Sequence, residues 1–150
     1  MSPFPDTSFL CSLYRQQVHS PRVVAYLHAL PGPLPVSSLL LLEFRQSVRI
    51  QARLNAKDRT KGYLRHEATR MLQSLQADLA SKELAILPVD WSDVHQLAEN
   101  LSARYTEQKG HRLADILHVA TALHLGASEF LTFDANQKSL AEAEGLVVAI

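Results

Sequence analysis

The chain has 150 residues, of which 47% are hydrophobic and 20% are charged, and this composition predicts one globular domain over residues 1–150 and argues against a disordered chain. Fifteen basic and fifteen acidic residues give a formal net charge of zero, so a nucleic-acid-binding function must rest on a local cluster of charge. A single cysteine, Cys11, excludes an internal disulfide and favours a cytoplasmic location, while apolar runs such as Leu39–Leu42 are far too short to span a membrane.

The first half of the chain alternates between short apolar segments and helical patterns. In chain order we expect a very short strand at 1–5, a helix from Thr7 or Ser8 to about Gln17, a helix from Pro21 to near Leu30, a strand at Leu34–Val36, and a long helix capped by Ser37 or Ser38. Because proline cannot donate to a sheet ladder, the two prolines of the first strand predict that only two or three of its residues pair.

The second half continues the alternation after a break near residues 55–60. We expect a helix at about Tyr63–Ser81, a strand at Leu84–Val89, a helix from Asp90 or Ser92 to about Tyr105, a helix at Leu113–Leu125, a strand at Glu129–Phe133, a helix to about Glu144, and a final strand at Val147–Ile150. This order predicts an α/β fold with a mainly parallel sheet.

Four acidic residues occupy positions that suit a common site. Asp6 and Asp134 each follow a predicted strand, Glu43 lies in the first turns of the helix after the second strand, and Asp115 lies early in an apolar helix. Ligands of parallel α/β sheets bind outside the carboxyl ends of the strands, so these side chains can meet there. Carboxylates suit Mg²⁺ or Mn²⁺, and such an ion favours hydrolysis of a phosphodiester.

Each of these acids also has an ordinary structural explanation. Asp6 and Asp134 can cap the helices that follow them, and Glu43 can interact with a helix dipole or a surface neighbour. Asp115 can pair with Arg112. The joint placement of the four acids therefore carries more weight than any one of them.

Four segments, in the same order, resemble the motifs of the PIN-domain family, and of its VapC-like toxins in particular. They are Pro5-Asp6-Thr7-Ser8-Phe9-Leu10, Ser37–Phe44, His111–Ala122, and Phe130–Asp134 followed by Gln137 and Leu140. The resemblance implies a three-layer α/β/α fold and Mg²⁺- or Mn²⁺-dependent cleavage of RNA. It implies metal coordination by Asp6, Glu43, Asp115 and Asp134, with Ser8 and Thr132 as supporting polar groups. For VapC-like members it also implies a cognate antitoxin protein and a homodimer.

Basic residues gather in the middle of the chain. Arg45, Arg49, Arg53 and Lys57 recur every four residues, and the segment 44–70 carries a local excess of positive charge. We expect RNA contacts from Arg45, Arg49 and Arg53, and phosphate contacts from His111 and Arg112. The alternatives are a solvated helix face or a surface that meets an acidic antitoxin segment.

Other residues favour packing over chemistry. The histidines, His118 and His124 among them, lack the spacing of a zinc site, and Cys11 lies among apolar neighbours as a small hydrophobic residue would.

Three other functions compete with the nuclease. A phosphatase with Asp6 as nucleophile is disfavoured because Ser8 stands where a second acid is usual, and a phospho-receiver domain is disfavoured because an acidic pair near the first strand is absent. A catalytically silent PIN-like module that binds RNA or protein is the main alternative, and the presence of all four acids argues against it.

Overall fold

Four short parallel strands form the middle of the molecule. A computed structural model describes residues 2–150 and places β1 (Pro3–Pro5) beside β4 (Glu129–Leu131), and β2 (Leu34–Val36) beside β3 (Leu84–Ile86). In the first pair Pro3, Phe4 and Pro5 align with Glu129, Phe130 and Leu131. The three paired residues of β1 confirm the short first strand, and Met1 lies outside the described residues.

The prolines of β1 explain why the strands form two pairs and not one continuous ladder. The carbonyl of Ser2 and the N–H of Asp6 bond to Ser128 and Leu131 on the β4 side. Backbone groups of alternate residues point to opposite edges of a strand, so Pro3 and Pro5 face the other neighbour and have no N–H to donate. β1 and β2 therefore lie next to each other without a ladder between them.

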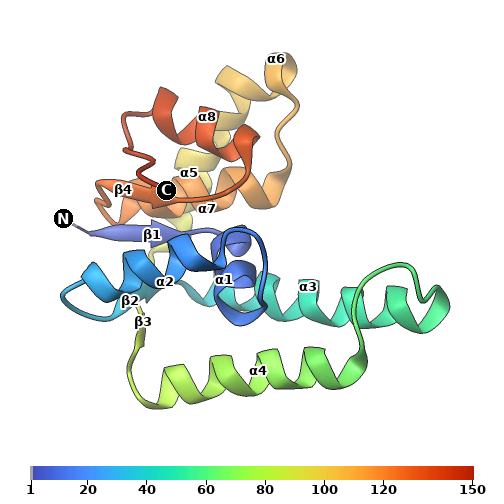
Figure 1. Cartoon of the computed structure of the whole chain (residues 1–150). Coiled ribbons are helices and arrows are strands. Elements are labelled where there is room, and N and C mark those ends of the chain that lie inside the picture. Colours follow the sequence, from blue (N-terminus) through green and yellow to red (C-terminus); the bar gives the residue numbers. More distant parts are fainter. Residues whose placement is uncertain (1) are drawn as a thin grey trace.

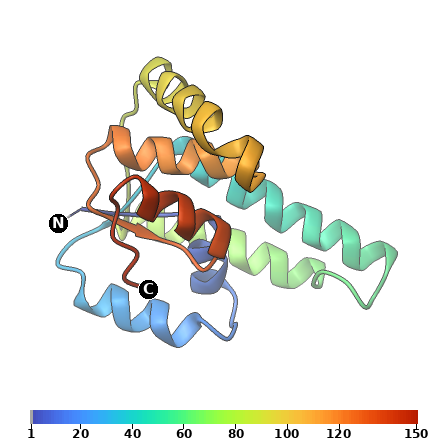
Figure 2. The same cartoon turned by 90° about the horizontal axis from the view of Figure 1, so that it is seen from above.

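Helices cover the strands on both sides, which confirms the α/β/α layering (Figure 1). In Figure 1 helices α1 to α4 lie beside and below the strands, and α5 to α8 lie above them; Figure 2 shows α5 and α7 packed side by side. The helices are α1 (Thr7–Tyr14), α2 (Ser20–Ala29), α3 (Ser38–Lys57), α4 (Arg65–Ala80), α5 (Trp91–Leu101), α6 (Glu107–Lys109), α7 (Leu113–His124) and α8 (Ala135–Ala143), with a π-helical turn η1 (Ser102–Thr106) after α5.

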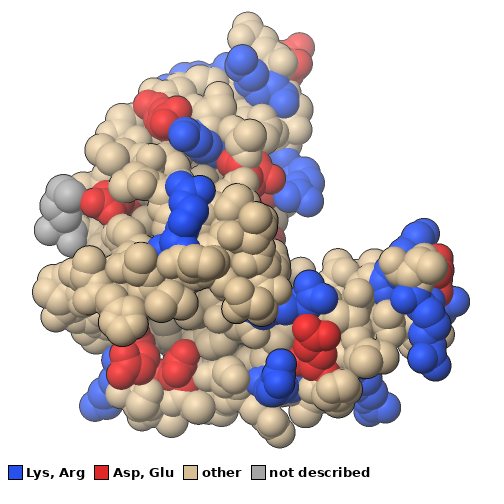
Figure 3. Space-filling view, in the orientation of Figure 1, with Lys and Arg blue, Asp and Glu red and all other residues tan. Residues whose placement is uncertain are grey.

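Helices α3 and α4 extend beyond the rest of the molecule as an antiparallel arm (Figures 1 and 2). The turn at its end folds back onto α3. Gly62 has a φ of +60°, and a Cβ there would lie 2.0 Å from the carbonyl oxygen of Gln51, so the turn requires glycine at this position. The arm and the body meet in a concave corner, which Figure 3 shows as an L-shaped outline.

Several predicted boundaries were wrong. The first helix is capped by Asp6, not by Thr7 or Ser8, and it ends at Tyr14. The third strand ends at Ile86, two residues before Pro88, and the fourth ends at Leu131 because Thr132 and Asp134 turn away into side-chain hydrogen bonds. The predicted final strand at Val147–Ile150 is only an isolated bridge between Val147 and Glu129.

The helix predicted to end near Tyr105 continues through η1 and α6 to Lys109, where Gly110 ends it with a φ of +69°. One hydrophobic core joins the elements, with Phe4, Phe9, Phe44 and Phe130 among its largest fully buried side chains. In the described part of the chain, no helix has both the length and the apolar character needed to cross a membrane.

Candidate functional site

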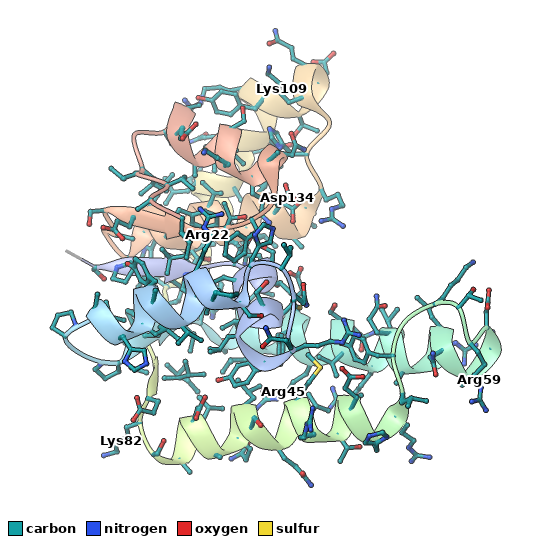
Figure 4. All side chains as sticks on the ribbon, viewed as in Figure 1. Arg22, Arg45, Arg59, Lys82, Lys109 and Asp134 are labelled. Atoms are coloured by element: carbon teal, nitrogen blue, oxygen red, sulfur yellow. The ribbon has the colours of Figure 1, made fainter. Side chains whose placement is uncertain are left out.

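A pocket of about 410 Å³ opens between residues 43–50 of α3 and the beginnings of α1, α7 and α8, next to the carboxyl ends of β1 and β4. Three of the four predicted acids, Glu43, Asp115 and Asp134, line it. Figure 4 shows Asp134 on the side of the body that faces the arm. The predicted convergence on one end of the sheet is therefore observed for these three side chains.

The fourth acid, Asp6, lies directly behind the pocket wall. It is fully buried, and both of its oxygens accept hydrogen bonds: Oδ1 from the Ser8 hydroxyl (2.6 Å) and the Phe9 N–H (3.0 Å), and Oδ2 from the Gln137 amide (2.8 Å) and the Thr132 hydroxyl. Burial raises the pKa of Asp6, and the hydrogen bonds from Ser8, Thr132 and Phe9 offset the rise only in part. Asp6 thus caps α1 and also contacts the inner side of the site through Ser8 and Gln137, which line the pocket.

Ser8 and Thr132 connect the β1–α1 junction to the β4–α8 junction. The Ser8 hydroxyl accepts from the Phe133 N–H (2.9 Å), and the Thr132 hydroxyl accepts from the Asp134 N–H (3.0 Å). Each hydroxyl donates its own proton to Asp6. The two hydroxyls that the resemblance implied as supporting groups therefore fix the carboxylate and the strand end at the same time.

Glu43 projects from the second turn of α3 and is held by two side chains of other helices. The Thr7 hydroxyl donates to its Oε1, and His118 Nε2 lies 3.0 Å from the same oxygen. Burial alone would raise the pKa of Glu43, but the hydrogen bonds from His118 and Thr7, together with the charges of His118 and Arg112, hold it below its usual range. Glu43 is therefore ionised at neutral pH.

Asp115 is buried on α7 and pairs with Arg112, three residues earlier. Arg112 Nε lies 3.1 Å from Oδ2, and a terminal nitrogen lies 3.4 Å from Oδ1. The hydrogen bond and charge of Asp115 raise the pKa of the Arg112 guanidinium, and the charges of Asp134 and Glu43, which line the same pocket, raise it further. The predicted pairing of Asp115 with Arg112 is observed, and Asp115 lines the same pocket as Glu43 and Asp134.

Asp134 caps α8. Its Oδ1 accepts from the N–H groups of Asn136 and Gln137, both at 2.9 Å. The capping explanation is thus correct for Asp6 and Asp134, and it does not exclude a place in the site, because one carboxylate has enough lone pairs for both.

The side chains of the pocket are of the type that binds a hard divalent ion, but they do not lie close enough together to surround one. Three carboxylates and one guanidinium line the pocket. Within residues 2–150, no three acidic, histidine or cysteine side chains lie close enough together to coordinate a single ion. Oxygen donors and a negative balance are the chemistry that Mg²⁺ and Mn²⁺ prefer, so the residue types fit such an ion although their spacing does not close around one.

The predicted RNA contacts lie at different places. Arg112 lines the pocket, whereas His111 is buried and does not. Steps of four residues advance by about 40° around a helix, so the basic series spirals around α3 and does not follow one line. Arg45 lies about 160° from Glu43 around the axis, on the side of α3 that faces α4 (Figure 4), while Arg49 and Arg53 are exposed between those two directions.

Sequence reasoning missed the two side chains that hold Glu43. His118 is fully buried and was expected to be a packing residue, and Thr7 was expected only as a possible helix cap. The spacing of Asp115 and His118, three residues apart on one helix, was the available signal. Cys11 agrees with its expected inert character: burial first, then the charges of Asp6 and Glu43, raise its pKa to about 11.

Comparisons with known proteins agree with the fold described above. The family model described as "PIN domain" matches residues 4–143. A search of curated proteins gave no match.

Among solved structures, the chain is similar to Mycobacterium tuberculosis VapC20, described as a sarcin–ricin loop cleaving toxin, with 18% identity, a TM-score of 0.68 and 97% of each chain covered. It is similar to FitAcB from Neisseria gonorrhoeae (21% identity, TM-score 0.66, 97% of this chain and 95% of that chain covered). It is also similar to a toxin–antitoxin complex from Klebsiella pneumoniae (18% identity, TM-score 0.63, 99% of this chain and 97% of that chain covered).

Proposed function

Because the chain belongs to the PIN-domain family, we propose that it is a divalent-metal-dependent endoribonuclease that hydrolyses RNA phosphodiester bonds. The observation that carries the proposal is the meeting of Glu43, Asp115 and Asp134 in one pocket, with Asp6 directly behind its wall. A cluster of this kind is more than helix capping needs. The VapC20 structure is of a toxin described as cutting the sarcin–ricin loop, which supports RNA as the substrate class.

In this proposal Glu43, Asp115 and Asp134 hold Mg²⁺ or Mn²⁺, and Asp6 joins them or orients a bound water. The ion, when bound, supplies an activated water and neutralises charge on the phosphate. His118 and Thr7 keep the Glu43 carboxylate in one orientation. Ser8 and Thr132 do the same for Asp6, and Arg112 turns from Asp115 toward the substrate phosphate.

A pair of matched variants tests the assignment. Asp134→Asn and Asp90→Asn change chemically equivalent residues, because Asp90 caps α5 by accepting from the N–H groups of Ser92 and Asp93. Asparagine caps a helix about as well as aspartate, so both variants should fold. RNA cleavage with Mg²⁺ or Mn²⁺ should be lost in Asp134→Asn, kept in Asp90→Asn, and absent for the unmodified protein in a chelator. Equal activity of the two variants would remove Asp134 from the site.

We also propose that the protein is the toxin of a toxin–antitoxin pair, acts in the cytoplasm as a single domain over residues 1–150, and binds a cognate antitoxin. Two of the similar structures are FitAcB and a toxin–antitoxin complex, which supports the choice of partner. Co-expression with the protein encoded beside it should relieve growth arrest and yield a complex that co-purifies. If expression of the protein arrests growth, and the arrest is relieved only by substitutions that abolish RNA cleavage and not by any partner protein, the antitoxin part of the proposal is contradicted.

A homodimer is part of the same proposal, and an apolar hollow supports it. This hollow has a volume of about 320 Å³, lies between α3, α5 and α7, and is lined by Leu39, Leu42, Trp91 and Leu117. The side chain of Leu42 is 61% exposed. Leu42→Ser should shift the protein toward a monomer in sedimentation velocity. Leu64→Ser, at another exposed leucine, is the control and should leave the dimer intact.

The second candidate function is a catalytically silent PIN-like module that binds RNA or protein. The closed hydrogen-bond shell of Asp6 and the Arg112–Asp115 pair favour it. RNA that is bound but left uncut with Mg²⁺, Mn²⁺ and other divalent ions would establish the silent module in place of the nuclease.

A further inference from the structure

The end of the arm carries a cluster of cations that the pocket does not use. We define the arm tip by Lys57, Arg59 and Lys61, which are exposed and in the described part of the chain take no part in an ion pair. Figure 3 shows this basic end of the molecule, and Figure 4 labels Arg59 there, far from Asp134. The one acid among them, Asp58, is occupied by the N–H (3.0 Å) and hydroxyl (2.7 Å) of Thr60.

The tip is a rigid turn and not a loose loop. The Asn55 amide donates to the carbonyl oxygen of Lys61 (2.9 Å), and the Asp58 N–H donates to the carbonyl oxygen of Leu54 (2.8 Å). Gly62 packs against the backbone of Gln51 with no space for a side chain. The cations are thus presented on a fixed backbone, and a ligand that binds them does not have to order the chain first.

The tip lies on the pocket side of α3 but well away from the acids. Lys57 follows Glu43 by 14 positions on one straight helix, which corresponds to roughly 21 Å along the axis and about 40° around it. A polymer that enters the pocket and runs along the concave corner therefore reaches the tip. At about 3.4 Å per stacked nucleotide, the distance corresponds to roughly six nucleotides.

We propose that the arm tip binds the phosphate backbone of the RNA substrate about six nucleotides from the bond that is cut, so that the protein recognises long RNAs better than short ones. The inference rests on the proposed ribonuclease function. The composition of the tip favours RNA over a protein, because residues 55–62 contain no large apolar side chain. Protein interfaces depend on buried apolar or aromatic anchors, whereas phosphate contacts need only cations.

The test compares Arg59→Gln/Lys61→Gln with the charge-matched control Lys82→Gln/Lys109→Gln, whose lysines lie at the other end of α4 and at the top of the molecule (Figure 4). Binding to RNAs of roughly 5, 10 and 20 nucleotides is measured by fluorescence anisotropy in EDTA, and kcat/KM for the same RNAs is measured with Mn²⁺. For single-stranded RNA, each phosphate contact adds about 0.7 to the slope of log affinity against log salt concentration. The loss of two contacts therefore corresponds to at most ~25-fold weaker binding at 0.1 M salt. We expect a loss of several-fold up to this value for the longest RNA, little loss for the shortest, and no loss in the control.

Several outcomes would overturn the arm-tip proposal. An equal loss of affinity for RNAs of every length would show that Arg59 and Lys61 act near the pocket or only through long-range electrostatic attraction. No loss of affinity at any length would show that RNA does not reach the tip. Loss of a co-purified antitoxin with unchanged RNA binding would assign the tip to a protein partner. In each of these cases the unmodified protein still cuts RNA, so the proposed ribonuclease stands; if it neither binds nor cuts RNA with any divalent ion, both proposals fall.

Discussion

Replacement of Asp6 by asparagine separates the chemical role of this residue from its structural one. The asparagine side chain keeps the cap of α1, because its carbonyl oxygen can accept the Phe9 N–H. The difficulty is the other end of the side chain, where the Gln137 amide and the Thr132 hydroxyl both donate in the native protein. The Thr132 hydroxyl can rotate, and the Gln137 amide can turn over to present Oε1, a buried atom with no hydrogen-bond partner among the described residues.

The expected magnitudes follow from this count. At most one hydrogen bond is lost, which costs about 1 kcal/mol, and relief of the buried charge offsets part of that loss. In a protein of this size we expect the melting temperature to change by no more than about 4 °C. Cleavage should fall by about a thousandfold or more, which corresponds to roughly 4 kcal/mol of lost transition-state stabilisation. RNA affinity should survive in large part, because it rests on arginine and lysine contacts.

The assay combines a cleavage time course, a thermal melt and an RNA titration on one preparation of Asp6→Asn. Asp6→Ala is the contrast: it removes the cap and leaves several buried donors unpaired, each at about 1–3 kcal/mol, and should unfold at a much lower temperature. Full cleavage by a folded Asp6→Asn protein would refute the placement of Asp6 in the active site. Loss of folding in Asp6→Asn would show that the charge itself is structural.

Three further predictions concern the charges of the site. Because burial raises the pKa of Asp6, its contribution to stability is greatest below the ordinary value of 3.8 and declines as the pH rises through the pKa of the folded protein. In thermal melts at graded pH, the stability of Asp6→Asn relative to the unmodified protein should therefore increase over that range. A difference that stays constant with pH would contradict the burial argument. Arg112→Gln should bind Mn²⁺ about two- to tenfold more tightly than the unmodified protein in calorimetry, because a competing cation leaves the pocket. The control Arg104→Gln, which breaks a comparable pair with Glu144, should bind Mn²⁺ as the unmodified protein does. Equal Mn²⁺ affinities of Arg112→Gln and the unmodified protein would show that Arg112 does not compete with the ion. His118→Ala should lower kcat more than it weakens RNA binding, with Gln at the same position recovering part of the loss; an unchanged kcat would remove His118 as a positioning residue for Glu43.

The sequence located the acids well because their positions depend on local rules. An acid directly after a parallel strand lies at the carboxyl edge of the sheet whatever the details of packing, and this held for Asp6 and Asp134. The helix junction at Ser37 likewise placed Glu43 in the first turns of α3. Strand-to-helix junctions are properties of a few neighbouring residues, so their places can be read from the chain to within a few residues, although the exact cap of α1 and the exact ends of β3 and β4 could not.

The features that sequence reasoning missed depend on contacts between distant residues. The burial of Asp6 is produced by Thr132 and Gln137, 126 and 131 positions away. The role of His118 depends on its approach to Glu43, 75 positions away. The basic series of α3 looked continuous because residues four apart are neighbours, but its slow rotation around the axis is evident only over several turns. The division of the strands into pairs follows from which edge Pro3 and Pro5 face, which the sequence does not specify.

The hydrogen bonds around Asp6 also determine when the site comes into existence. They join the first strand to residues 132–137, so no shorter N-terminal fragment contains them. Synthesis proceeds from the N-terminus, so a contact between two residues can form only after the later one has been made. Asp6 therefore leaves the ribosome well before its partners at residues 132–137 are synthesised. By this order of assembly, the proposed catalytic centre cannot form until residue 137 has been translated.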